Sequence, residues 1–119
     1  NPARINVGSI ALYEMDGKGI VSPMYVCFTT KRTLLPGYLK HYFASQTFRH
    51  EMFKRLEGSV RLCLTFDSLC NIEIPLPSIE LQENVGKYLS TIERKISLEE
   101  SMLSQYQLQR SYLLSQMFI

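Results

Sequence analysis

The last third of the chain constrains its fold most, because it contains no proline between Ile79 and Phe118 and a single glycine, Gly86. Apolar residues recur there in steps of four, three and four positions and then in whole heptads. A 3.5-residue repeat sustained over this length predicts one long helix with an apolar seam of the coiled-coil type. The seam comprises Val85, Leu89, Ile92, Ile96, Glu99, Leu103, Tyr106, Arg110, Leu113 and Met117.

A helix of this length needs a partner to cover its seam. At 1.5 Å per residue, roughly forty positions extend about 60 Å, far beyond the breadth of the small domain that the preceding residues can form. We therefore expect the helix to pair with another helix, which predicts that the chain self-associates.

Two charged residues, Glu99 and Arg110, interrupt the apolar seam. A charge at such a position lowers stability but can specify the register or the partner. In an antiparallel pairing, Glu99 could approach Arg110 of the opposite helix. Alternatively, both long side chains could extend to the edge of the seam and reach solvent. The pattern leaves both interpretations open, and with them the choice between parallel and antiparallel pairing.

Three segments before the helix have the composition of short strands. Residues 20–28 are β-branched and aromatic, residues 60–66 alternate in polarity, and residues 71–77 end in two prolines that lack a backbone donor. Each is therefore expected to be a strand.

Between the first two of these segments, apolar residues of 37–57 follow helical spacing, with a slip near 45–47 that indicates two short helices. Pro36 suits the first turn of a helix, and Gly58 is placed to end one. The expected fold class is α+β. Residues 1–77 form a small mixed domain of short strands and one or two helices, and residues 78–119 form the long helix.

The net charge of +2 conceals a basic middle segment. Residues 31–61 contain seven Lys and Arg against two Glu, a net charge of +5, which leaves −3 for the rest of the chain. A basic segment between mildly acidic ends is typical of a site for an anionic partner. The alternative is a solvated helix face that is rich in Lys and Arg.

Arg61 follows a Gly-Ser turn, Gly58-Ser59, at the start of a predicted strand. An arginine at such an edge can donate two hydrogen bonds to a phosphate or to the edge of a guanine. The alternative is an exposed arginine that pairs with Glu57.

The chain lacks the motifs of common enzyme, nucleotide and metal sites, so no catalytic residue, metal or cofactor is expected. His41 and His50 lie nine positions apart on the predicted helical segment, which would point them in opposite directions. Cys27, Cys63 and Cys70 are odd in number and have apolar neighbours; they are expected to be buried free thiols in a reducing compartment, the cytoplasm. No apolar run approaches the roughly 20 residues that a membrane span needs.

The stretch from Gly58 onward resembles the C-terminal part of a repeat in the specificity subunits of type I restriction–modification systems. Such repeats close with a glycine turn, a strand, the motif I-x-I-P-x-P and a helix that opens with a Glu-Gln pair. One departure is Leu81, which stands where the acid of that pair is usual. Residues 19–28 and 35–45 resemble the middle of the same recognition domain. The residues that carry the motif are Gly58, Arg61, Leu69, Ile72, Ile74, Pro75, Pro77, Gln82, Val85, Leu89, Ile92, Glu93 and Ile96.

This resemblance implies sequence-specific recognition of double-stranded DNA by a non-catalytic subunit. In the family, two recognition domains each read half of a split target, and long paired helices set the distance between them. Methylation and cleavage belong to methyltransferase and restriction subunits, which use S-adenosylmethionine and ATP. A full recognition domain is expected to begin before Asn1. The expected DNA-binding residues are Lys31, Arg32, Arg49, Lys54, Arg55, Ser59 and Arg61.

Two other functions are compatible with parts of the pattern. A coiled-coil interaction module without a DNA role would use the seam alone, and its basic segment would be a solvated surface. A small enzyme is disfavoured by the missing motifs.

Overall fold

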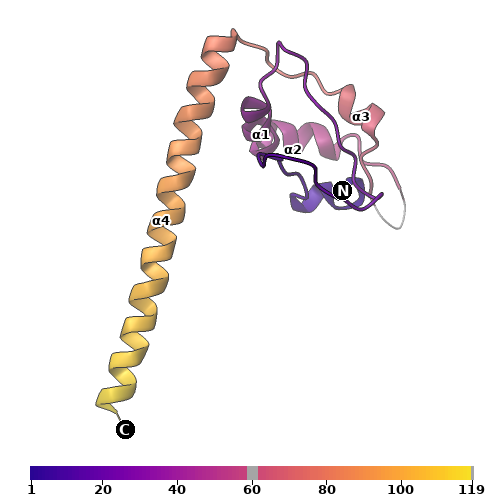
Figure 1. Ribbon diagram of the computed structural model, residues 1–119. Helices are drawn as coiled ribbons and strands as arrows, with labels where there is room; N and C mark the ends of the chain where they lie inside the picture. Colours follow the sequence, from indigo (N-terminus) through magenta and orange to yellow (C-terminus); the bar gives the residue numbers. More distant parts are fainter. Residues whose placement is uncertain (59–61, 119) are drawn as a thin grey trace. The chain divides into compact units, whose positions relative to one another are not determined.

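The computed structural model describes residues 1–58 and 62–118. Its helices are the 3₁₀ helix η1 (Pro2–Val7) and the α-helices α1 (Pro36–Ala44), α2 (Gln46–Phe53), α3 (Phe66–Cys70) and α4 (Ile79–Met117) (Figure 1). The chain divides into two compact units, Asn1–Gly86 and Lys87–Ile119. The first two turns of α4 therefore belong to the first unit.

Helices α1 and α2 are separated by a single residue, Ser45. Its extended backbone ends α1, and its hydroxyl oxygen accepts a hydrogen bond from Phe48 N at 3.1 Å, which caps α2. Helix α1 begins at Pro36, whose missing N–H has no partner to lose in a first turn. The predicted pair of short helices is confirmed, and Ser45 supplies the physical reason for the slip in periodicity.

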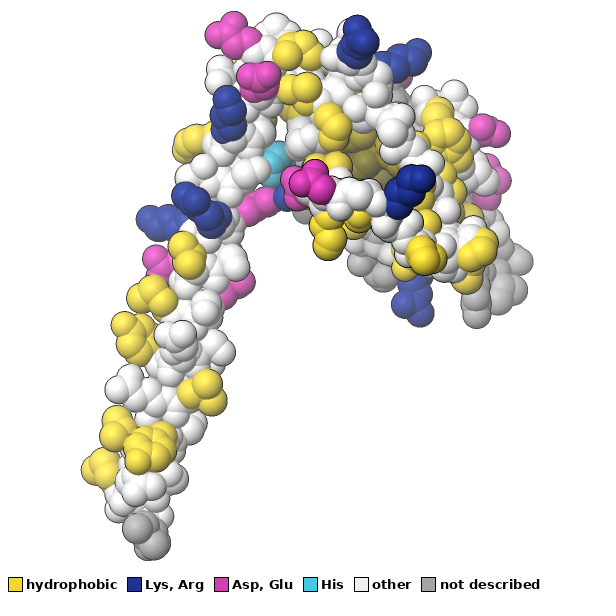
Figure 2. Space-filling model, viewed as in Figure 1, with side chains coloured by type: hydrophobic (Ala, Val, Ile, Leu, Met, Phe, Trp, Pro, Cys, Tyr) yellow, Lys and Arg dark blue, Asp and Glu magenta, His cyan; other side chains and the backbone are white. Residues whose placement is uncertain are grey.

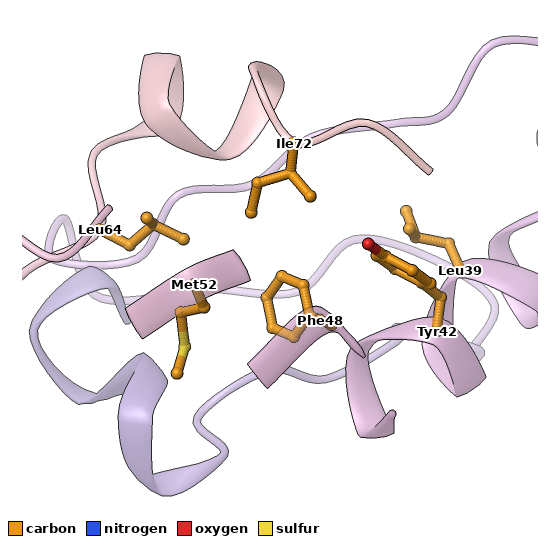
Figure 3. Close-up of a cluster of buried hydrophobic side chains, with 6 residues drawn as sticks. All are labelled: Leu39, Tyr42, Phe48, Met52, Leu64 and Ile72. Carbon is orange, nitrogen blue, oxygen red and sulfur yellow. The ribbon is translucent and has the colours of Figure 1, made fainter. Parts of the chain in front are cut away.

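The core of the first unit lies between α1, α2 and the segments that flank α3. Phe48 is 2% exposed, and its ring lies 5.8 Å from that of Tyr42 and 4.7 Å from that of Phe43. Leu64 and Ile72 point toward Met52 and Phe48 (Figure 3). The buried apolar residues are Leu39, Tyr42, Phe48, Met52, Leu64 and Ile72.

The prediction of an α+β fold is wrong, because the described residues contain no strand and are mostly helical where they are regular. Glu57 and Cys63 form an isolated antiparallel bridge, with N–H···O distances of 3.0 and 2.8 Å. Strand propensity reports how well a residue suits a paired, half-buried surface. The segments predicted as strands have the composition but lack a neighbouring strand.

The three segments predicted as strands, 20–28, 60–66 and 71–77, differ in their local structure. Within residues 20–28 the chain turns, with Tyr25 N donating to Ser22 O at 3.0 Å, and large side chains such as Met24 remain exposed. Residues 71–77 run without regular structure to Ser78, since two prolines remove donors that a ladder needs. The start of the predicted strand 60–66 lies outside the described residues, and α3 begins at its last residue, Phe66.

Two smaller expectations are also wrong. Gly58 does not end α2, because that helix ends at Phe53; Gly58 has φ 115° and follows the bridge residue Glu57. The cysteines are free thiols, but they are not buried: Cys27 and Cys70 are exposed and Cys63 is half-buried. The apolar neighbours of Cys27 are exposed as well, whereas Leu64, next to Cys63, lies in the core, so apolar neighbours in the sequence did not imply a buried cysteine.

Helix α4 confirms the predicted long helix. Its 39 residues extend roughly 58 Å at 1.5 Å per residue. Ser78 caps it, since the hydroxyl oxygen accepts from Leu81 N at 3.3 Å. From Lys87 to Met117 its residues are exposed, apart from half-buried Leu89. In the described part of the chain, no helix is both long and apolar enough to cross a membrane.

Candidate nucleic-acid interface and helix seam

Lys31 and Arg32 lie side by side in the turn that precedes α1. The turn is closed by a hydrogen bond from Leu34 N to Lys31 O at 3.0 Å, and both basic residues are exposed. Two adjacent cations on a hydrogen-bonded turn can contact neighbouring phosphates of one strand.

The end of α2 brings a second pair of candidate residues, Lys54 and Arg55, against Glu51. Lys54 Nζ donates to one carboxylate oxygen of Glu51 at 2.8 Å, and Arg55 Nη1 donates to the other and to Glu51 O at 3.0 Å. These hydrogen bonds, that of Lys54 first, lower the pKa of Glu51 to about 2. The carboxylate is therefore charged at neutral pH and offsets part of the positive charge of its two partners.

Arg49 is exposed on α2, five positions before Lys54. At 100° per residue these two side chains point about 140° apart around the helix axis. The structure therefore places Lys31 beside Arg32 and Lys54 beside Arg55. Arg49 and Lys54 do not lie on the same side of the helix. Ser59 and Arg61 lie outside the described residues, and so does the alternative pairing of Arg61 with Glu57.

An apolar hollow lies beside the core of the first unit, and Lys31 is among its lining residues. Aromatic and aliphatic side chains both line it, and the rings of Phe28 and Phe66 lie 5.7 Å apart. Burial raises the pKa of the Tyr42 phenol, with a further contribution from the negative charge of Glu51. The hollow is lined in part by Phe28, Tyr42, Phe43, Phe48 and Phe66.

No metal site is formed by the residues that the structure describes, since no three His, Cys, Asp or Glu side chains gather. His41 lies on α1 and His50 on α2. The two histidines therefore do not lie on opposite sides of one helix, as the sequence predicted.

The predicted seam lies on one continuous helix, and most of it is exposed. Ile92 is 40% exposed and Met117 72% exposed, whereas Val85 and Leu89 are half-buried. Figure 2 shows hydrophobic side chains spread along the surface of α4. The charged residues Glu99 and Arg110 are also exposed.

A shallow depression lies on the exposed surface of α4. It is formed by two overlapping sets of residues spaced i, i+3, i+4 and i+7, which is the arrangement of a hole in knobs-into-holes packing. Ile96 and Glu99 belong to both sets. The full lining is Ile92, Lys95, Ile96, Glu99, Glu100 and Leu103.

Gln82 is a residue whose structural role the sequence did not reveal. It is 1% exposed, and its amide joins the loop before α1 to the start of α4. The sequence singled it out only as part of a motif, because a glutamine at the start of a helix is ordinarily a surface residue.

The match to a protein family identifies the class of the chain. The family of the type I restriction modification DNA specificity domain matches residues 4–106. The chain belongs to this family. Its function is DNA target recognition in type I restriction–modification, as a non-catalytic component of those complexes. The predicted family and function are therefore confirmed. No curated protein and no solved structure matched the chain.

Proposed function

We propose that residues 1–77 contact duplex DNA through their basic segment, and that residues 78–119 assemble the complex by pairing with a second helix. The partners are the methyltransferase and restriction subunits, and the compartment is the cytoplasm. The exposed cations before α1 support the first part of this proposal. The unpartnered seam of α4, which is the observation that carries the second part, would be costly to leave in water.

The DNA contacts are divided among the basic residues according to their surroundings. Lys31, Arg32 and Arg49 are exposed and are the principal phosphate contacts. Lys54 and Arg55 contribute less, because Glu51 offsets their charge. Ser59 and Arg61 are assigned to the site from the family motif alone.

A salt titration of DNA binding tests this division. Lys31→Ala/Arg32→Ala removes two phosphate contacts and should reduce the slope of log affinity against log salt by roughly 1.8, at about 0.9 per contact. Lys87→Ala/Arg94→Ala on α4 is a matched control, since it removes the same charge from the second unit, on the side of the helix away from the seam. Equal slopes for the two variants would show that the turn makes no specific contribution.

For the seam, an antiparallel pairing of two copies gives a consistent register. If Glu99 faces Arg110 of the second copy, Ile96 faces Leu113 and Leu103 faces Tyr106. Each pair of facing seam residues between positions 92 and 117 is then either apolar or of opposite charge. A parallel pairing would place Glu99 against Glu99 and Arg110 against Arg110, which is unfavourable. We therefore favour the antiparallel arrangement.

Sedimentation equilibrium of the full chain tests the pairing. Leu103→Glu places a charge on the seam and should shift the chain toward monomer. Ser101→Glu adds the same charge on the opposite side of α4, about 200° away, and should leave association unchanged. A wild-type chain that is monomeric at every concentration would overturn the self-association.

A further inference from the structure

The side chain of Gln82 holds three separate backbone groups. Its amide oxygen accepts a hydrogen bond from Leu35 N at 2.9 Å. Its amide nitrogen donates to Thr33 O and to Pro77 O, both at 2.9 Å. Both N–H groups of the amide are thus used, and at 1% exposure water does not compete for them.

These contacts fix the turn that carries two of the proposed DNA contacts. Thr33 follows Lys31 and Arg32 directly, and Leu34 N closes the turn onto Lys31 O. Leu35 is the residue that precedes α1, and it has no side-chain cap of its own. Gln82 therefore restrains the turn at two backbone atoms within three residues of the basic pair.

The same side chain ties this turn to the beginning of α4. Pro77 precedes the capping residue Ser78, and Gln82 lies in the second turn of the helix. The amide group of Gln82 contacts Leu35 and Thr33, which lie 47 and 49 positions earlier in the sequence. All of these groups lie within the first compact unit.

We propose that Gln82 is a positioning residue for DNA binding, which presets the turn so that Lys31 and Arg32 present their charges in one geometry. The inference rests on the proposed DNA contacts of those two residues. A preset turn loses less conformational entropy when it meets the phosphate backbone, so its cations contribute more to affinity. Without Gln82 the same charges remain on the chain but lose their common geometry.

Gln82→Met tests this proposal, because it keeps the length of the side chain and removes all three hydrogen bonds. Gln82→Asn is a milder variant that keeps an amide and places no charge in the core, but it is one methylene shorter and so loses at least one of the three hydrogen bonds. Gln105→Met, at an exposed position of α4, is the matched control. The full chain is titrated with a short duplex at several salt concentrations, and near-ultraviolet circular dichroism of the core aromatic residues reports folding.

The expected result is a loss of affinity with a reduced salt slope in both Gln82 variants and no change in the control. Adding Lys31→Ala/Arg32→Ala to Gln82→Met should then cost much less than the same change costs in the wild-type chain. A purely structural role would lower stability without changing the salt slope of the folded fraction.

Four results would contradict the proposal, and they are distinguishable. If Lys31→Ala/Arg32→Ala alone has no effect, the proposed DNA contacts are wrong and the inference fails with them. If that variant weakens binding but Gln82→Met does not, or if the two losses simply add, the inference alone is wrong. If even Gln82→Asn loses the signal of the folded core, Gln82 supports the whole unit and has no narrower positioning role.

Discussion

Glu51 accepts a hydrogen bond from Lys54 Nζ at 2.8 Å. Arg55 donates to the other oxygen of the same carboxylate, so one acid serves two bases at the end of α2. Two of the residues expected to bind DNA are therefore engaged within the protein. The basic segment is less positive in effect than its composition indicates, and its charge depends on the state of one carboxyl group.

Replacing that carboxylate should strengthen DNA binding. Glu51→Gln raises the net charge by one and releases Lys54 and Arg55 from an ionic partner. We expect a several-fold increase in affinity at low salt and a steeper dependence on salt, by about 0.9 for each further phosphate that is neutralised. Fluorescence anisotropy with a labelled duplex measures both quantities. Glu14→Gln changes the same charge at another exposed position and is the control; equal increases would remove Lys54 and Arg55 from the interface.

The hydrogen bonds that Glu51 accepts from Lys54 and Arg55 make the free energy of unfolding depend on pH in the acid range. Hydrogen bonds from Lys54 and Arg55 lower the pKa of Glu51 from 4.5 to about 2 in the folded chain. The folded state therefore favours the charged carboxylate, and its contribution is present above about pH 4.5 and is lost as the pH falls toward 2. The difference in free energy of unfolding between wild type and Glu51→Gln should shrink over this window. A carboxyl resonance of Glu51 that titrates near its ordinary pKa would contradict this.

Phe48 and Phe53 offer a matched test of the core, because they lie on the same helix with opposite exposure. Phe48 is 2% exposed and packs against two rings, whereas Phe53 is 53% exposed. Phe48→Ala should destabilise the first unit by about 3–5 kcal/mol, enough to unfold a small domain, while Phe53→Ala should cost about 1 kcal/mol or less. Chemical denaturation measures both. Similar losses would show that Phe48 is not at the centre of the core.

The long helix could be predicted from sequence because its signal is local and repeated. Periodicity, the absence of proline and the single glycine all favour a long helix over 78–119, and α4 spans Ile79–Met117 of that segment. The strand predicted at 20–28 could not be judged in this way, because a strand must pair with a neighbour that the sequence pattern does not identify. The same limit applies to the contacts of Gln82, which join residues almost fifty positions apart.

For the basic residues, the composition located the segment but did not show which of the side chains form ion pairs within the protein. Helical spacing places Glu51 three and four positions before Lys54 and Arg55, so their ion pairs could have been foreseen from sequence. The exposure of Lys31 and Arg32 could not have been foreseen from sequence, because it depends on how the turn packs against the core.

The charged positions of the seam provide the final test, which separates antiparallel from parallel pairing. In the antiparallel register, Glu99→Arg places two arginines together, and Arg110→Glu places two glutamates together. Each single change should weaken the dimer by roughly 1–3 kcal/mol, about tenfold in dissociation constant for each 1.4 kcal/mol. The double change restores opposite charges in both layers and should restore association. Parallel pairing places like charges together in the wild type and in the double variant, so it predicts no such recovery.

Arg94→Glu changes a charge on the side of α4 away from the seam and controls for net charge. Sedimentation equilibrium of the five chains decides the matter: a double variant as weak as the single ones would rule out the pairing of Glu99 with Arg110.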